Sequence, residues 1–205
     1  MGIYNKYILP KVIDYSCRQK PTMMQRQKVI PLAKGNVLEI GIGSGLNLAF
    51  YKEDNINHLL AIDPSEDLWR KNKFDLQNLP YDFEFLKAFA EDIPLDSNSF
   101  DTVVLTYTLC TIKETHKALE EIRRVLKDNG KLIFCEHGKA PDKVVQKWQK
   151  RINPIWKRIG GGCNFNRDIP AIIEDSGFKL NKMETMYIPG WKPASFNYWG
   201  TAEIK

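Results

Sequence analysis

The chain has 205 residues, of which 43% are hydrophobic and 27% are charged, and 30 Lys and Arg against 25 Asp and Glu give a net charge of +5. These values are ordinary for a globular domain and exclude fibrous architectures and long disordered tracts. The length suits a single α/β domain with a sizeable core. Because acids are interspersed with the basic residues, the mild positive charge does not by itself indicate a nucleic-acid partner.

The cysteines predict the redox environment of the protein. Cys17, Cys110, Cys135 and Cys163 form no C-x-x-C pair, so we expect reduced, packed thiols and no metal site. The first residues lack the apolar core of a signal peptide, and no run of about eighteen apolar residues occurs. We therefore expect a cytoplasmic protein, with peripheral contact to a membrane left open.

The elements in chain order predict the fold. Residues 5–33 read as two short helices with a turn near Pro21, and we expect residues 1–34 to form a helical lid. A domain over 35–205 begins with a strand that runs from Asn36 into a glycine-rich turn and a helix. The sequence then predicts further strands at 58–63, 83–89, 102–107, 131–137, 178–188 and 196–204, and helices at 65–78, 114–127, 142–159 and 168–176.

Asn129-Gly130 should stop the helix that precedes residue 131, and Pro154 should interrupt the basic helix 142–159. Apolar strands that alternate with helices predict right-handed parallel crossovers. The expected fold class is α/β: a doubly wound, seven-stranded, mostly parallel sheet with helices on both faces, which is a Rossmann-like arrangement.

The segment Val37-Leu-Glu-Ile-Gly-Ile-Gly-Ser-Gly45 carries the strongest functional signal. A strand that ends in Gly41, Gly43 and Gly45 brings the backbone close to a ligand. Asp63, at the end of the next strand, is placed to accept hydrogen bonds from both ribose hydroxyls of an adenosine group. A dinucleotide site is disfavoured because Leu46 replaces its third glycine. Glu39 would repel a pyrophosphate and suits a cationic ligand such as an amino group or a sulfonium.

This segment resembles the S-adenosylmethionine-binding motif of class I methyltransferases, particularly the ubiquinone/menaquinone-type branch. The stretches Glu91-Asp-Ile-Pro-Leu-Asp and Leu119-x-Glu-Ile-Arg-Arg-Val-Leu-Lys-x-x-Gly-Lys-Leu extend the resemblance over residues 35–137. It implies that S-adenosylmethionine is the cofactor and S-adenosylhomocysteine the product. The residues that it assigns to the cofactor are Gly41, Gly43, Gly45 and Asp63, then Pro64 and Ser65 beside the adenine, Ala90 and Glu91 at the adenine edge, and Thr106 and Tyr107 near the methionine and the methyl group. Many relatives carry Asp where this chain has Phe89, so the adenine contact shifts to a neighbouring acid or to backbone.

The acceptor end of the site is less specified by the sequence. His137, after the fifth strand, is the best candidate base by its ionisation range, and a role in hydrogen bonding the loop stays equally open. Tyr107 is the second candidate catalytic residue. We expect the acceptor pocket to be built from about residues 138–170, with Trp and Phe side chains as its lining or as ordinary core. The stretches Leu109-Cys-Thr-Ile, Phe134-Cys-Glu-His and Pro154–Cys163 resemble a group that includes membrane-associated alkyl-thiol methyltransferases and related bacterial proteins.

The sequence therefore predicts an S-adenosylmethionine-dependent methyltransferase that acts by in-line displacement on a small, largely apolar acceptor: a thiol, an amine, or a phenol- or quinone-like oxygen. One alternative is a phospholipid-headgroup N-methyltransferase at a membrane surface, since a helix with Trp, Lys and Arg can dock on anionic lipid. Another is a non-catalytic protein that binds the cofactor. A nucleic-acid substrate is not expected, and the oligomeric state stays open.

Overall fold

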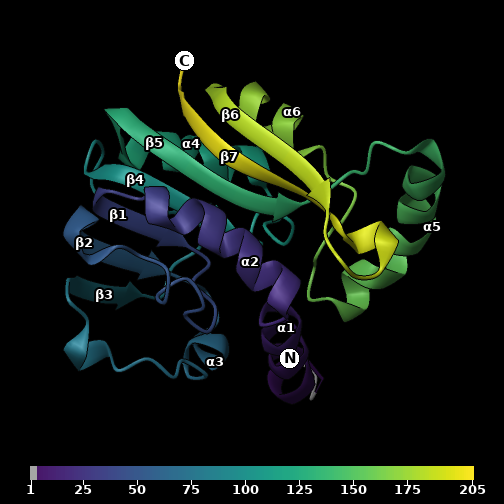
Figure 1. Cartoon of the computed structure of the whole chain (residues 1–205), viewed down its shortest axis with the longest axis horizontal. Helices are drawn as coiled ribbons and strands as arrows, with labels where there is room; N and C mark the ends of the chain where they lie inside the picture. Colours follow the sequence, from purple (N-terminus) through teal and green to yellow (C-terminus); the bar gives the residue numbers. More distant parts are fainter. Residues whose placement is uncertain (1–3) are drawn as a thin grey trace.

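A seven-stranded sheet forms the centre of the molecule in our computed structural model, which describes residues 4–205 (Figure 1). The first three residues of the predicted lid lie outside the described residues. The strands are β1 (Gly35–Ile40), β2 (Ile56–Ile62), β3 (Asp82–Leu86), β4 (Phe100–Thr106), β5 (Leu126–His137), β6 (Phe178–Tyr187) and β7 (Phe196–Ile204). Their order is β3-β2-β1-β4-β5-β7-β6, and β7 runs antiparallel to both of its neighbours while the other pairs are parallel.

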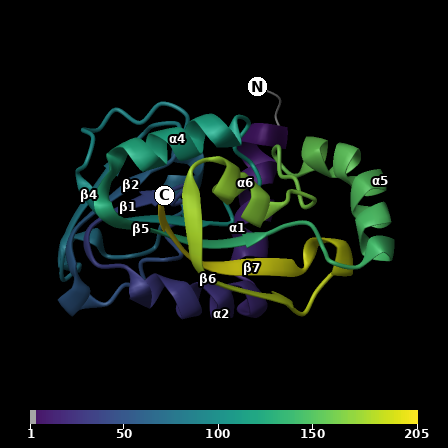
Figure 2. The same cartoon turned by 90° about the horizontal axis from the view of Figure 1, so that it is seen from above.

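Helices cover both faces of the sheet, as the sequence predicts. They are α1 (Leu9–Cys17), α2 (Lys20–Val29), α3 (Glu66–Trp69), α4 (Thr115–Val125), α5 (Lys143–Ile159) and α6 (Ile169–Asp175). Helices α4 and α6 lie on one face and α2 on the other, while α5 lies beside the sheet (Figure 2). None of the helices among residues 4–205 has the length and apolar content needed to cross a lipid bilayer.

Alternate residues of the central strands fill two separate cores. Leu38 of β1 and Val103 of β4 pack with α4 residues on one face. Val37 and Val104, their neighbours in sequence, pack with residues that follow α2 on the other face. Because both faces are buried, these strands are almost uninterrupted apolar runs.

Several element boundaries differ from the sequence prediction. No regular helix follows the glycine loop: residues 43–50 form successive turns, because positive φ angles at Gly43 and Gly45 are incompatible with a helix. The helix expected at 65–78 is reduced to the four residues of α3. Helix α4 ends at Val125, before Asn129-Gly130, because Leu126 is already extended and pairs with Phe100.

Two proline predictions have different outcomes. Pro10 and Pro21 lie in the first turns of α1 and α2, where a missing N–H costs nothing, and the chain breaks between these helices at residues 18–19. Pro154 is expected to interrupt the basic helix, but α5, which is 17 residues long, continues through Pro154. A helix that lies beside the sheet is free to absorb the local distortion that proline causes.

Candidate active site

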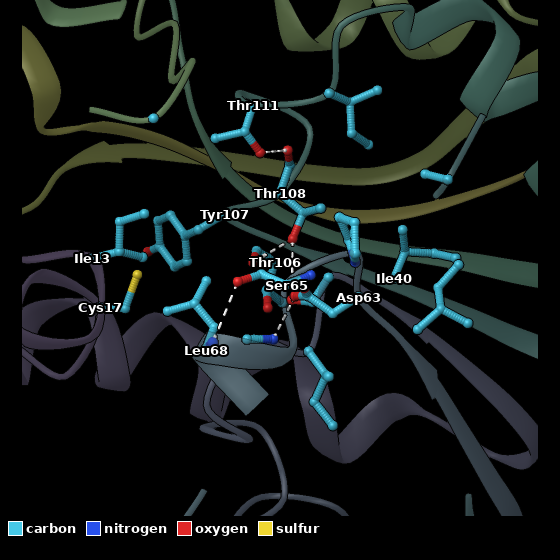
Figure 3. Close-up of a pocket in the computed structure, with 18 of the residues that line it drawn as sticks. Ile13, Cys17, Ile40, Asp63, Ser65, Leu68, Thr106, Tyr107, Thr108 and Thr111 are labelled. Atoms are coloured by element: carbon cyan, nitrogen blue, oxygen red, sulfur yellow. Dashed lines mark hydrogen bonds between the residues drawn. The ribbon is translucent and has the colours of Figure 1, made fainter. Parts of the chain in front are cut away.

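A cavity of about 390 Å³ lies where the carboxyl ends of β1, β2 and β4 meet (Figure 3). Ile40, Ile62 and Thr106, the last residues of these strands, line it. Helix α1 closes the opposite side with Leu9, Ile13 and Cys17, among others. The cavity therefore occupies the position at which open α/β sheets bind ligands.

The glycine loop forms one wall of the cavity, in which Gly41 and Gly43 carry no side chain. The Gly41 N–H donates to the Ile62 carbonyl at 2.7 Å, which ties the loop to β2. A Cβ atom added at Gly41 would meet Thr108 at 2.4 Å, whereas one added at Gly43 would meet nothing within 4 Å. Gly41 is thus required by packing, while Gly43 exposes its backbone to the open cavity. Gly45 lies outside the cavity wall and packs against Asn72 and Leu48.

Asp63 is the buried acid of the site. Its two carboxylate oxygens accept hydrogen bonds from Gly43 N at 2.9 Å and from Ser65 N at 2.7 Å. Burial raises the pKa of Asp63 above its usual value, and the two N–H donors partly oppose that rise. Each oxygen retains a second lone pair for a hydroxyl donor in the cavity.

Glu39 takes a position that the sequence analysis did not anticipate. Its carboxylate lies behind the cavity wall and accepts hydrogen bonds from Asn47 Nδ2 and Tyr51 OH, both at 2.8 Å. Burial raises its pKa to about 7, against the lowering effects of Tyr51 and Arg26. Glu39 therefore acts on the cavity through its neighbours rather than by contact.

Arg26 of α2 links this buried network to the cavity. Its Nη1 donates to Asn47 Oδ1 at 2.8 Å and to Thr106 Oγ1 at 2.6 Å. The guanidinium carbon lies 5.1 Å from the centre of the Tyr107 ring. Sequence reasoning missed Arg26 because nothing in a basic helix distinguishes the one cation that turns inward.

A second charged group, Asp14 of α1, also lines the cavity and was missed. It accepts hydrogen bonds from Arg18 and from the Ser44 hydroxyl of the glycine loop. Although burial alone would raise its pKa, these bonds hold the pKa of Asp14 below its usual value. Asp14 therefore joins α1 to the loop as a carboxylate.

Most of the other predicted residues do line the cavity. They are Pro64, Ser65, Ala90, Glu91, Thr106 and Tyr107. Tyr107 adopts a left-handed conformation with φ of 54°, and its N–H donates to the Cys135 carbonyl at 2.8 Å. The Tyr107 hydroxyl donates to Asn197 Oδ1 at 2.7 Å, and burial raises its pKa well above 10. The proton of the Tyr107 hydroxyl is therefore used in a hydrogen bond to Asn197 of β7.

His137, the candidate base, lies outside the cavity wall that the described residues form. Its ring is roughly parallel to that of Tyr107, with centroids 6.3 Å apart. Its Nε2 lies 3.4 Å from Cys163 Sγ, and Cys110 completes a cluster of three. The pKa of Cys163 is lowered by its hydrogen bond with the Cys110 thiol and by the charge of the His137 imidazole. The pKa of Cys110 is raised by the same hydrogen bond and by burial. The cluster was missed because its members are far apart in sequence.

Of the region 138–170, Gly161 is the residue that reaches the cavity. The aromatic side chains considered for the acceptor pocket lie elsewhere: Trp156, Phe165 and Trp191 pack on one another with centroids 5.7–5.8 Å apart. Trp148 lines a separate, more open hollow beside α5. Helix α1, which the sequence analysis assigned to a lid, forms one side of the main cavity.

Comparisons with known proteins agree with this arrangement. A methyltransferase domain family matches residues 38–134. Over 97% of its length the chain is 33% identical to human thiol S-methyltransferase TMT1B, of which it covers 85%. It is also 33% identical to rat TMT1B over 79% of its length and covers 65% of that protein. The ubiquinone/menaquinone biosynthesis C-methyltransferase UbiE of Rickettsia prowazekii is 33% identical over 59% of the chain, which covers 52% of that enzyme.

Solved structures extend the likeness to the fold. An S-adenosylmethionine-dependent methyltransferase from Thermotoga maritima superposes with a TM-score of 0.66 at 18% identity, covering 99% of this chain and 100% of that one. The predicted fold class and the predicted cofactor, S-adenosylmethionine, are thereby confirmed. The chain belongs to the class I S-adenosylmethionine-dependent methyltransferases.

Proposed function

We propose that this methyltransferase transfers the methyl group of S-adenosylmethionine to the sulfur of a small, largely apolar thiol. The observation that carries the proposal is the similarity to a thiol S-methyltransferase along 97% of the chain. The chemistry of the cavity supports it in three respects: the fit to the cofactor, the apolar wall on the side of α1, and the lack of a poised base on that side.

The cavity residues fit the cofactor. Gly43 presents its backbone to open space, and the buried Asp63 keeps lone pairs for the two ribose hydroxyls. Pro64, Ser65 and Ala90 line the same cavity and would flank the adenine. When bound, the cofactor supplies an electrophilic methyl group on a sulfonium. The protein then has to place a nucleophile in line with that methyl group and exclude water from it.

Helix α1 provides the apolar wall for an acceptor. Ile13 and Cys17 lie beside Tyr107, on the side of the cavity away from Ile40 (Figure 3). Leu9 and Pro10 extend this wall. An apolar thiol gains about 25 cal/mol for each Å² of surface that such a wall removes from water. The wall also strips water from the attacking sulfur, which strengthens it as a nucleophile.

On the side of α1, neither the Tyr107 hydroxyl nor the Asp14 carboxylate is poised as a general base. The Tyr107 hydroxyl is a committed donor, and Asp14 is held as a carboxylate of low basicity by Arg18 and Ser44. Such a site disfavours amines and phenols, which need deprotonation, and favours a thiol, which is partly ionised near neutral pH. The Arg26 guanidinium at the cavity wall stabilises the thiolate form by charge attraction.

A product assay tests the proposal. The purified chain is incubated with S-adenosylmethionine and, separately, with benzenethiol, a short alkyl thiol, benzylamine or phenol, and the products are measured by mass spectrometry. We expect the thiols to give a methyl thioether and S-adenosylhomocysteine in equal amounts. Methylation of the amine or the phenol with no reaction of either thiol would overturn the choice of acceptor. Cofactor binding without any turnover would favour a non-catalytic binding protein instead.

We also propose that α5 makes peripheral contact with an anionic lipid surface. Val144, Trp148 and Ile155 of this helix expose 68%, 53% and 65% of their surface. The same helix carries Lys143, Lys147, Lys150, Arg151, Lys157 and Arg158. An exposed apolar stripe with Trp among basic side chains is typical of helices that lie in the membrane interface. The Tyr4 hydroxyl donates to the Ile159 carbonyl at 2.6 Å, so Tyr4 adjoins the end of this helix.

Vesicle co-sedimentation tests the lipid contact. We expect the protein to pellet with vesicles of phosphatidylcholine and phosphatidylglycerol, less so at high salt, and the double variant Trp148→Ala, Ile155→Ala to stay in solution. Leu76→Ala, which removes an exposed side chain far from α5 in sequence, is the matched control. Equal pelleting of the double variant and the control would contradict the proposal. Phosphatidylethanolamine in the vesicles tests headgroup N-methylation, which a methylated lipid product would reveal.

A further inference from the structure

The cluster of Cys110, His137 and Cys163 has no role in the function proposed above. Cys110 lies in the loop after β4, His137 ends β5, and Cys163 lies in the loop after α5. The two sulfurs and an imidazole nitrogen all lie within 4.8 Å of one another. Among residues 4–205 this is the one group of His, Cys, Asp or Glu side chains with the spacing of metal ligands.

The geometry matches a tetrahedral zinc site. With Zn–S near 2.3 Å and Zn–N near 2.0 Å, tetrahedral angles place a thiolate sulfur and an imidazole nitrogen about 3.5 Å apart. Cys163 Sγ and His137 Nε2 lie 3.4 Å apart. The widest separation within the cluster, at most 4.8 Å, exceeds the ideal sulfur–sulfur distance by only about 1 Å. Thiolates and imidazole are also the ligand types that zinc prefers.

The backbone around the cluster is already fixed. Asn164, next to Cys163, donates to the Cys110 carbonyl through both its backbone N at 2.9 Å and its Nδ2 at 3.1 Å. Glu136, next to His137, accepts from Thr108 N at 2.7 Å and from Leu109 N at 2.9 Å. The three segments that carry the ligands are thus tied to one another, which is the pre-organisation that a metal site requires.

The cluster adjoins the cavity on the side of Tyr107 and Gly161. Tyr107, Thr111 and Gly161, which line the cavity, lie within three residues of Cys110 or Cys163 in sequence, and the Cys110 thiol contacts the Tyr107 carbonyl. His137 and Cys163 are only partly buried, so an ion from solvent can reach them. Three protein ligands leave one position of a tetrahedral ion vacant, as in catalytic zinc sites.

We propose that Cys110, His137 and Cys163 bind a zinc ion whose fourth position takes the sulfur of the acceptor thiol. The assignment of the fourth ligand rests on the proposed function, whereas the three-residue metal site does not. Binding to the ion removes the thiol proton to solvent and holds the sulfur as a thiolate. The metal ion would then activate the acceptor thiol in place of a general base.

Cobalt substitution tests the metal site without any measurement of activity. The reduced protein is stripped with a chelator, and Co²⁺ is added while absorption is recorded. We expect one equivalent of Co²⁺ to give thiolate charge-transfer bands and the intense visible bands of tetrahedral Co²⁺, and Zn²⁺ to abolish them. Cys163→Ser and His137→Asn should weaken binding at least tenfold, whereas Cys17→Ser, a thiol outside the cluster, should retain it. Absence of the bands in the unaltered protein, or their persistence in both cluster variants, would overturn the site. Circular dichroism shows whether the variants are folded.

A second arm tests the fourth ligand. Benzenethiol added to the cobalt form should intensify and shift the charge-transfer bands, and phenol should not. Unchanged bands together with thioether production would overturn the fourth-ligand assignment and leave the proposed function standing. Shifted bands without any thioether would support the metal site and contradict the proposed function.

Discussion

Replacement of Glu39 by Gln tests how the buried network of the site responds to pH. The structure raises the pKa of Glu39 to about 7 from a usual 4.5. The folded protein therefore binds more protons than the unfolded chain between these pH values, and the free energy of unfolding falls as pH rises through that window. At about 1.4 kcal/mol for each pKa unit, the Glu39 contribution amounts to about 3 kcal/mol, present below pH 4.5 and lost above pH 7.

Urea unfolding measured at pH 5 and at pH 8 provides the assay. Most of the titration of Glu39 falls between these values. From pH 5 to pH 8 we therefore expect the free energy of unfolding to fall by about 2–3 kcal/mol less in Glu39→Gln than in the unaltered protein. The Gln amide oxygen still accepts from Asn47, and Tyr51 can turn its hydroxyl to accept from the new amide N–H. The variant should therefore stay folded, with an unchanged dependence of stability on urea.

Two other glutamates, Glu136 and Glu84, help to interpret this measurement. Glu136 also has its pKa raised to about 7 by burial, so part of the pH dependence should persist in the variant. Glu84→Gln, at an exposed position of β3, is the matched control for the same change of side chain. If Glu39→Gln and Glu84→Gln lose the same stability between pH 5 and pH 8, the reasoning about the buried carboxyl is refuted.

Three further predictions concern the cavity. Asp63→Ala should weaken S-adenosylmethionine binding in calorimetry at least tenfold, since each hydrogen bond to a charged group is worth about 1.5–3 kcal/mol; unchanged affinity would remove Asp63 from the cofactor site. Gly43→Ala should also weaken binding, with a loss of about 1–2 kcal/mol of stability from its left-handed backbone; unaltered binding would show that the cofactor does not approach this backbone. Tyr107→Phe should cost about 1 kcal/mol in thermal unfolding through the lost bond to Asn197 and should leave thiol methylation in place, whereas an abolished reaction would make the hydroxyl catalytic.

The glycine loop and the acid after β2 were predictable because their chemistry is local. A strand, a turn with positive φ and a carboxylate at the next strand end are each encoded within a few residues. For the same reason Gly41, Gly43 and Asp63 lie where the sequence predicts. The helix expected after the loop failed because the same glycines that expose the backbone also prevent a regular helix.

Glu39 shows the limit of this reasoning. The sequence places it at the end of a strand, but the alternation of the strand decides which way the side chain points, and here it points to the face where Asn47 and Tyr51 lie. The sequence suggested that Glu39 faces a sulfonium. In the structure Glu39 is a buried carboxyl that holds Arg26 and Thr106 in place through Asn47.

The sequence by itself determined the fold class and the seven-stranded sheet, because these depend on hydrophobic period, and the resemblance of one local motif to class I methyltransferases identified the cofactor. Only the tertiary structure decided which segments close the cavity. Packing of α1 against the glycine loop made one side of the cavity, and chain crossings brought Cys110, His137 and Cys163 together from three separate segments. Contacts between distant segments depend on how the layers pack, and no spacing along the chain encodes them.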